Sequence, residues 1–179
     1  MRMKSSRWAP LAAIALLMAP GCYQSDFPLD STPRLDVDAA WLGTWRCLPF
    51  NADADEDPVT IAVGRGAERR YDITWRETGK EPEQYEAYES SVRGRRFMNV
   101  RERKAAGEMG QWVFLGATLL RPDVLQLQVV DAKALESVEK SPTSVRRALE
   151  RQLSRPTTLF ADFCVCVRAK QPSEPTPGR

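Results

Sequence analysis

Residues 41–50 read WLGTWRCLPF, and the order of apolar and polar side chains in them predicts the first strand of a β-sheet. Alternate residues of a strand point to the same face of the sheet. Trp45 and Cys47 therefore share one face, and Thr44 and Arg46 share the other. Indole and thiol side chains are usually buried, so we expect Trp45 and Cys47 to point inward.

The chain beyond this strand repeats a pattern of short apolar or alternating runs as far as Asp131, without a long helical period. Tyr71, Ile73 and Trp75, for example, alternate with polar neighbours, so one face of that run is apolar and the other is polar. Together with a further run near the end of the chain, the pattern predicts eight strands. They lie at residues 41–50, 59–63, 70–76, 84–92, 96–103, 111–120, 124–130 and 158–168.

One helical segment, at about residues 132–155, interrupts the strands before the last one. Ser141 followed by Pro142 is a good start signal, because serine caps a helix and proline suits its first turn. Val145 and Leu149 follow at four-residue spacing and belong to an apolar stripe. We expect this stripe to pack against the sheet.

An open antiparallel sheet of eight strands would have two unpaired edges, and the usual remedy at this number is to pair the first strand with the last. The interior of such a barrel holds packed side chains or one small ligand. We therefore predict a mainly β protein whose single domain, residues 39–169, is an eight-stranded antiparallel meander closed as a barrel. The alternative is a half-open sheet packed on the helices, with Trp41 and Trp45 in its core.

The tripeptide Gly43-Thr44-Trp45 resembles the glycine-x-tryptophan signature on the first barrel strand of lipocalins and their bacterial lipocalin-like relatives. The resemblance implies that the glycine permits tight bending at the closed end of the barrel. It also implies that the indole closes the bottom, often under a basic side chain from late in the sequence, for which Arg121 and Arg168 are candidates. The wall and floor of a lipocalin-like ligand pocket would be Trp41, Trp45, Ile73, Trp75 and Phe97.

Residues 1–21 have the layout of a secretory signal: a basic start, an apolar run too short to span a bilayer, and small residues before Cys22. Ala19-Pro20-Gly21-Cys22 resembles the lipobox of bacterial lipoproteins, in which a diacylglycerol is attached to the cysteine sulfur and a peptidase cuts before that residue. The resemblance implies that Cys22 becomes a lipidated N-terminus. Ordinary secretion with the same cleavage site is the alternative.

The segments next to the barrel domain show neither the helical nor the strand period. We expect a lipid-anchored tether at residues 22–38 and a disordered tail at residues 170–179. Two or three acyl chains anchor a protein stably in a membrane, where one does not. Tyr23 follows the lipidated cysteine, and by the sorting rule of enteric bacteria this implies delivery to the outer membrane, facing the periplasm.

The composition argues against several classes of function. Without its first 21 residues the chain carries 23 Lys and Arg against 24 Asp and Glu, so a basic nucleic-acid surface is not indicated. It contains no histidine, which excludes a histidine general base, a Ser-His-Asp or Cys-His nucleophile and the commonest zinc ligand sets. We expect no catalytic residue, no cofactor and no metal ion.

Cys47, Cys164 and Cys166 reach an oxidising compartment if the chain is exported, and we expect one disulfide among them. If the first and last strands are neighbours, Cys47 joins Cys164 or Cys166 across the barrel seam, which contributes roughly 4–5 kcal/mol in the chain-entropy model. The remaining thiol stays free or pairs between molecules. Cys164 and Cys166 share a strand face with Asp162 and Arg168, so an inward position for both cysteines requires a β-bulge.

Three charged regions have simpler interpretations. The acidic stretch 51–57 resembles a calcium loop but lacks the glycine and glutamate that such a loop needs, so we expect a solvated hairpin loop. The carboxylates between residues 81 and 89 are most simply surface charges. Basic turns at 65–70 and 93–96 suit an anion or anionic lipid, and otherwise provide solubility and protect edges.

Two functions fit these expectations. The first is an envelope-anchored lipoprotein that binds a small apolar or amphiphilic ligand without catalysis. The second is a structural or protein-interaction module of the bacterial envelope with a filled core and an unknown partner, in which a large exposed apolar patch would mark the contact. An enzyme would require a deep cleft with paired acids. The interior cavity of the barrel discriminates among these functions.

Overall fold

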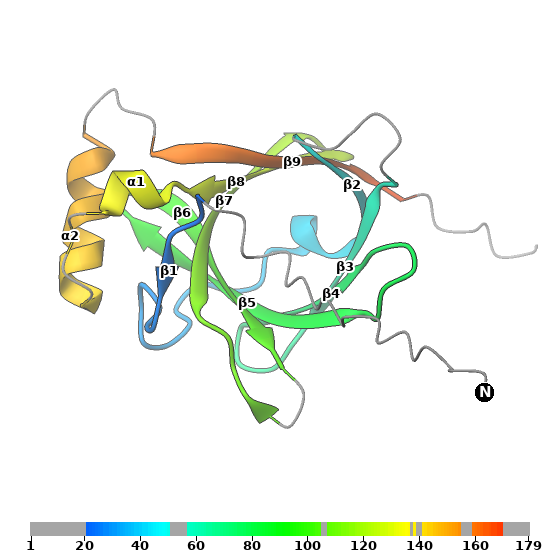
Figure 1. Ribbon diagram of the computed structural model, residues 1–179, viewed down its shortest axis with the longest axis horizontal. Helices are drawn as coiled ribbons and strands as arrows, with labels where there is room; N and C mark the ends of the chain where they lie inside the picture. Colours follow the sequence, from blue (N-terminus) through cyan, green and yellow to red (C-terminus); the bar gives the residue numbers. More distant parts are fainter. Residues whose placement is uncertain are drawn as a thin grey trace, which may run out of the picture.

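The fold is a closed antiparallel barrel of eight strands, β2 to β9, which the short strand β1 extends at one side (Figure 1). The structure is a computed structural model, and it describes residues 21–50, 57–104, 107–136, 138, 141–154 and 159–169. The barrel strands are β2 Gly43–Pro49, β3 Val59–Arg65, β4 Tyr71–Arg76, β5 Glu83–Val92, β6 Arg95–Arg103, β7 Trp112–Arg121, β8 Val124–Val130 and β9 Phe160–Arg168. The predicted meander and its closure are confirmed.

Closure joins the two ends of the domain in sequence. β2 pairs antiparallel with β3 on one side and with β9 on the other, so that Cys47 lies opposite both Val59 and Cys166. β9 pairs in turn with β8, and the seam leaves no free edge in the barrel. The bounds of the eight strands differ from the predicted ones by no more than two residues, because the alternation of side chains is a local property of each strand.

One end of the barrel is closed, and we call it the closed end. The 3-10 helix η2, Ala39–Trp41, lies across it, and the short turns 66–70, 93–94 and 122–123 connect strands there (Figure 1). We call the other end the mouth. Among the described residues no helix lies across the mouth, since the helices α1 and α2 pack against the outside of the barrel.

The closed end is held by a side chain from the last strand. Trp45 is fully buried, and the Arg168 guanidinium lies over its ring with Cζ 4.1 Å from the centroid. Arg168 also donates hydrogen bonds to the carbonyl oxygens of Leu42, at 2.6 Å, and Ala40, at 2.8 Å. Of the two candidates for the basic side chain above the indole, Arg168 therefore occupies this place, and Arg121 is exposed.

A β-bulge in β9 places both late cysteines inside the barrel. Leu127 of β8 lies opposite Cys164, and the next residue lies opposite Asp162, so Phe163 is the extra residue. Phe163 and Cys164 consequently both point inward, and Asp162 stays outside, where it accepts hydrogen bonds from two glutamines of β8. The bulge that the facing of the cysteines required is present.

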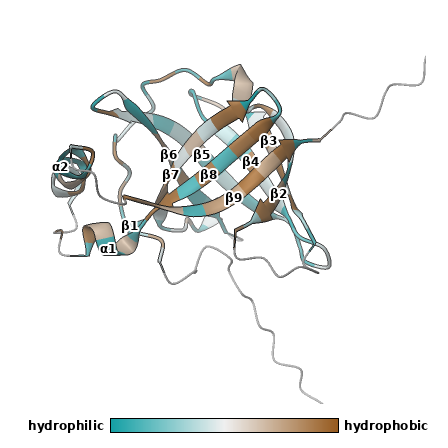
Figure 2. Cartoon of the chain, turned by 90° about the horizontal axis from the view of Figure 1, so that it is seen from above, coloured by the Kyte–Doolittle hydropathy of each residue, from teal (hydrophilic) through white to brown (hydrophobic). Residues whose placement is uncertain are grey.

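A second layer covers one side of the barrel. The helices α1, Ala132–Leu135, and α2, Pro142–Gln152, follow β8 and lie beside the barrel (Figure 2). Ser141 caps α2 by accepting a hydrogen bond from the Ser144 backbone N–H. Val145 and Leu149 of α2 are buried in a cluster that is separate from the interior of the barrel.

The segment 22–38 packs on the barrel, with Tyr23 and Leu29 in the same outer layer and Val37 in the interior cluster, which corrects the expectation of a tether. β1, Gln24–Ser25, pairs with the start of β7, and Leu29 is 5% exposed. The Leu29 backbone N–H donates to the amide oxygen of Asn99 at 2.9 Å. The sequence did not reveal this packing because the segment binds to the barrel through single buried side chains and backbone groups, without a periodic apolar face.

Phe97 also lies in the outer layer. It is fully buried on the outward face of β6 and stacks on Phe160 with ring centroids 5.6 Å apart. The prediction that Phe97 contributes to the wall of an interior pocket is therefore wrong in its placement. The error arose because both faces of β6 are covered here, so that an outward aromatic residue is as well buried as an inward one.

Gly43 should be difficult to replace. Its φ of +122° is unfavourable for other residues, and a Cβ atom there would lie 2.8 Å from Arg168 Nη1. We expect Gly43→Ala to lower the free energy of unfolding by about 1–3 kcal/mol, measured by urea denaturation. Gly64→Ala is the control, because its Cβ atom would meet nothing closer than 3.7 Å. Equal urea midpoints for Gly43→Ala and the wild type would contradict the proposed packing at the closed end.

Candidate functional site

The interior of the barrel contains an apolar cavity of about 90 Å³. Its walls come from all eight barrel strands and from η2, because inward positions of neighbouring strands converge on it. The lining residues are Trp41, Trp45, Ile61, Val63, Tyr71, Ile73, Trp75, Tyr85, Met98, Val100, Leu115, Ala117, Leu125, Leu127 and Phe163. No charged side chain is among them, so the cavity suits an apolar group.

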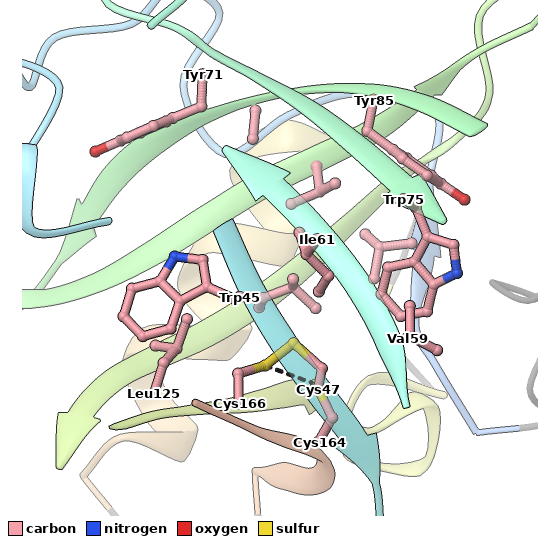
Figure 3. Close-up of a cluster of buried hydrophobic side chains, with 14 of the residues drawn as sticks. Trp45, Cys47, Val59, Ile61, Tyr71, Trp75, Tyr85, Leu125, Cys164 and Cys166 are labelled. Carbon is pink, nitrogen blue, oxygen red and sulfur yellow. Dashed lines mark hydrogen bonds between the residues drawn. A yellow bond between two sulfur atoms is a disulfide. The ribbon is translucent and has the colours of Figure 1, made fainter. Parts of the chain in front are cut away.

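Four of the five residues predicted for a pocket line this cavity: Trp41, Trp45, Ile73 and Trp75. Figure 3 shows Trp75 with Tyr85 on one side of the cluster and Trp45 with Tyr71 on the other. The prediction missed Tyr71, Tyr85 and Phe163 among the lining aromatics. The alternation in β4 and β5 could have located the two tyrosines. Phe163 points inward because it is the extra residue of the bulge, and the sequence indicated the need for a bulge but not its position.

A buried polar network lies at the closed end. The Tyr71 hydroxyl donates to Glu89 Oε1 at 2.6 Å and accepts from the Asp38 backbone N–H at 2.8 Å. Arg96 Nη1 pairs with the second oxygen of Glu89 at 3.1 Å, and Glu89 is only 3% exposed. Burial and the hydrogen bond to Glu89 raise the pKa of Tyr71. Glu89 is therefore neutralised by its own neighbours and is not available to a ligand.

The mouth has a different polar arrangement. The Trp75 indole N–H donates to Glu77 Oε1 at 2.9 Å, and the Tyr85 hydroxyl donates to Glu83 Oε2. Burial raises the pKa of Tyr85, and the hydrogen bond to Glu83 and the charge of nearby Glu102 raise it further. Aromatic rings and carboxylates therefore meet where the cavity approaches the mouth.

One lining group has no partner in the described part of the chain. The indole N–H of Trp41 is buried without a hydrogen bond, whereas the indole N–H of Trp45 donates to the Trp41 carbonyl oxygen at 3.0 Å. A buried donor without an acceptor costs about 1–3 kcal/mol. A molecule in the cavity with an acceptor oxygen near Trp41 would recover part of that free energy.

The cysteines form the seam disulfide that was predicted. Cys47 and Cys166 are bonded, 119 residues apart in the sequence, and Cys164 is the one of the three barrel cysteines that stays free. Cys164 Sγ lies 3.7 Å from Cys166 Sγ, and burial raises the pKa of its thiol to about 12. At neutral pH Cys164 is therefore an unreactive thiol. The three sulfurs lie within 4.8 Å of one another, but the disulfide leaves only one of them as a potential ligand.

Most charged groups of the three regions described in the sequence analysis are paired with other charged groups or lie away from the cavity. Glu86 is 7% exposed on the outside of the barrel, where Arg101 Nε donates to it at 2.6 Å and Arg70 lies at 3.5 Å. The basic turns lie at the closed end, and Arg69 there pairs with Asp36. Glu83 and Glu89, by contrast, bond to the cavity-lining residues Tyr85 and Tyr71, so the expectation that all carboxylates between residues 81 and 89 are surface charges is wrong for the buried Glu86 and Glu89.

Several expectations fall outside the described residues. They concern residues 1–20 of the predicted signal, residues 51–56 of the acidic loop and the tail 170–179. In the described part of the chain, no helix is long and apolar enough to cross a membrane.

Comparison of the chain with protein-family models, with curated proteins and with solved structures finds no match.

The buried thiol of Cys164 should destabilise the protein in alkali. The folded state keeps its proton to about pH 12, whereas the unfolded thiol ionises at its ordinary value of about 8.5. The free energy of unfolding therefore falls as the pH rises above about 8.5. In Cys164→Ala, urea unfolding with the disulfide intact should fall less steeply with pH. Val165→Ala, which removes no titratable group, should keep the slope of the wild type; a parallel slope in Cys164→Ala would contradict this assignment.

Proposed function

We propose that this protein is an envelope-anchored lipoprotein that binds a small apolar or amphiphilic ligand in a lipocalin-like barrel and performs no catalysis on it. The observation that carries the proposal is the apolar cavity, which an aromatic side chain bounds at each end: Trp45 at the closed end and Trp75 toward the mouth. In a barrel with a purely structural role we would expect side chains to fill the interior, because unfilled volume in a core lowers the stability of the protein.

The size of the cavity limits what it can take. An engineered apolar cavity of about 150 Å³ binds benzene, and the cavity of about 90 Å³ here is smaller. The buried part of the ligand is therefore a short aliphatic or small cyclic group, and any polar part stays at the mouth.

Lipid attachment at Cys22 places the barrel close to a membrane. Cys22 forms an isolated β-bridge with Asp131, and the Tyr23 backbone N–H donates to the Val130 carbonyl oxygen at 3.0 Å. Because the segment that follows Cys22 packs on the barrel, a lipid anchor at Cys22 would hold the barrel close to the membrane surface. We assign the protein to the bacterial envelope, anchored by lipid and facing the periplasm from the outer membrane.

Filling the cavity should weaken binding. We expect hexanol to bind to the wild-type protein and to change the fluorescence of the cavity tryptophans, because its chain enters the apolar space. Ala117 lines the cavity, and Ala117→Leu should weaken hexanol binding at least about tenfold by occupying that space.

Thr118→Leu is the matched control, since Thr118 is the next residue on the same strand and is exposed outside the barrel. Its affinity for hexanol should equal that of the wild type. If a folded wild-type protein binds no hexanol, the ligand-binding function is refuted and the envelope module with a filled core is favoured.

Lipidation can be tested in a bacterial host with an alkyne-labelled palmitate. The wild-type protein should incorporate the label and partition into the membrane fraction, because two or three acyl chains give stable anchoring. Cys22→Ser should lose the label and the membrane association, whereas Cys164→Ser should keep both. Label retained in Cys22→Ser would exclude Cys22 as the anchor.

A further inference from the structure

Three neighbouring strands each bring a carboxylate to the mouth. Glu83 on β5 lies opposite Trp75 of β4, and Glu102 on β6 lies opposite Tyr85 of β5. Glu77 follows Trp75 two residues along the chain, so it continues the inward side of β4 beyond the strand. All three carboxylates are half-buried. They form a group on one side of the mouth, directly beyond the aromatic rings of the cavity.

The chain supplies little positive charge to this group. Lys80 pairs with Glu77, and among the described residues the Glu102 carboxylate has no ion-pair or hydrogen-bond partner. Lys104, after the end of β6, is exposed. The inward residues that the flanking and more distant strands bring to this end are apolar: Val59, Val113, Val129 and Phe163. Half-buried carboxylates without a matching cation are unfavourable, and a ligand cation would offset this cost.

The aromatic residues beside these carboxylates point to the same ligand chemistry. Trp75 and Phe163 stack with ring centroids 6.0 Å apart, and Tyr85 lies near Trp75 (Figure 3). In Figure 3 the indole nitrogen of Trp75 and the hydroxyl of Tyr85 lie on the same side, away from Trp45. Aromatic faces attract ammonium groups, and quaternary ammonium ligands are commonly bound between such rings.

We propose that the mouth recognises the ammonium group of a cationic amphiphile whose short apolar part occupies the cavity. The inference rests on the proposed ligand-binding function and specifies its ligand class. The carboxylates of Glu83 and Glu102 neutralise the ammonium group, and Trp75 and Tyr85 contact it. At the closed end, Arg96 is paired with Glu89 and Arg168 covers Trp45, so neither of these two arginines is available to an anionic amphiphile.

The proposal is tested with three compounds that share one hexyl chain. Isothermal titration of the full-length folded protein should give a Kd for hexyltrimethylammonium about tenfold lower than that for hexanol. Hexanoate should bind more weakly than hexanol. The preference for the cation should decrease in about 0.5 M salt, since salt screens partly exposed charges.

Two variants separate the carboxylates at the mouth from the general charge of the protein. Glu102→Gln should weaken hexyltrimethylammonium binding about fivefold and leave hexanol binding unchanged. Glu81→Gln removes one exposed charge from the neighbouring connection and should change neither affinity.

The possible failures are distinguishable. If none of the three compounds binds, the ligand-binding function itself is refuted, and the ammonium site with it. If hexanol binds and hexanoate binds as tightly as hexyltrimethylammonium, the cavity function stands and the ammonium site is refuted. Equal losses in Glu102→Gln and Glu81→Gln would also refute it, because the preference would then reflect overall charge.

Discussion

The burial of the Trp45 indole beneath the Arg168 guanidinium is the interaction on which the rest of the barrel depends. A cation over an aromatic face contributes about 2 kcal/mol when both groups are desolvated. Here the same guanidinium also donates hydrogen bonds to the chain that leads into β2, at the carbonyl oxygens of Ala40 and Leu42. Because Trp45 lies on the first barrel strand and Arg168 on the last, the contact exists only in the closed barrel.

Closure divides the buried residues into two groups with different tasks. The inward side chains surround the cavity, whereas the outward side chains of β5 to β7 are covered by the N-terminal segment and by α2. The outer layer binds its own polar groups: Arg146 of α2 donates to the Ser91 carbonyl oxygen at 2.6 Å and pairs with Asp30. Because the outer layer adds these contacts, the stability of the barrel does not depend on filling its centre completely, and the interior can contain a cavity.

The polar groups at the two ends explain why the ends are not equivalent. At the closed end Glu89 is neutralised by Tyr71 and Arg96. At the mouth Glu83 has only the Tyr85 hydroxyl among the residues described, and Glu102 has no partner there. A carboxylate that is satisfied within the protein stabilises structure, whereas one without a matching charge selects the charge of a ligand.

The strands, the start of α2 at Ser141 and the inward face of β4 were predictable, because side-chain alternation and helix capping are expressed within a few residues. By itself the sequence determined these local elements and the presence of an apolar strand face. Only the tertiary structure decided that Phe97 lies outside the barrel, that the bulge at Phe163 turns both late cysteines inward, and that Cys47 pairs with Cys166. Each of these depends on the register between strands distant in sequence, and a shift of one residue reverses the face to which a side chain points.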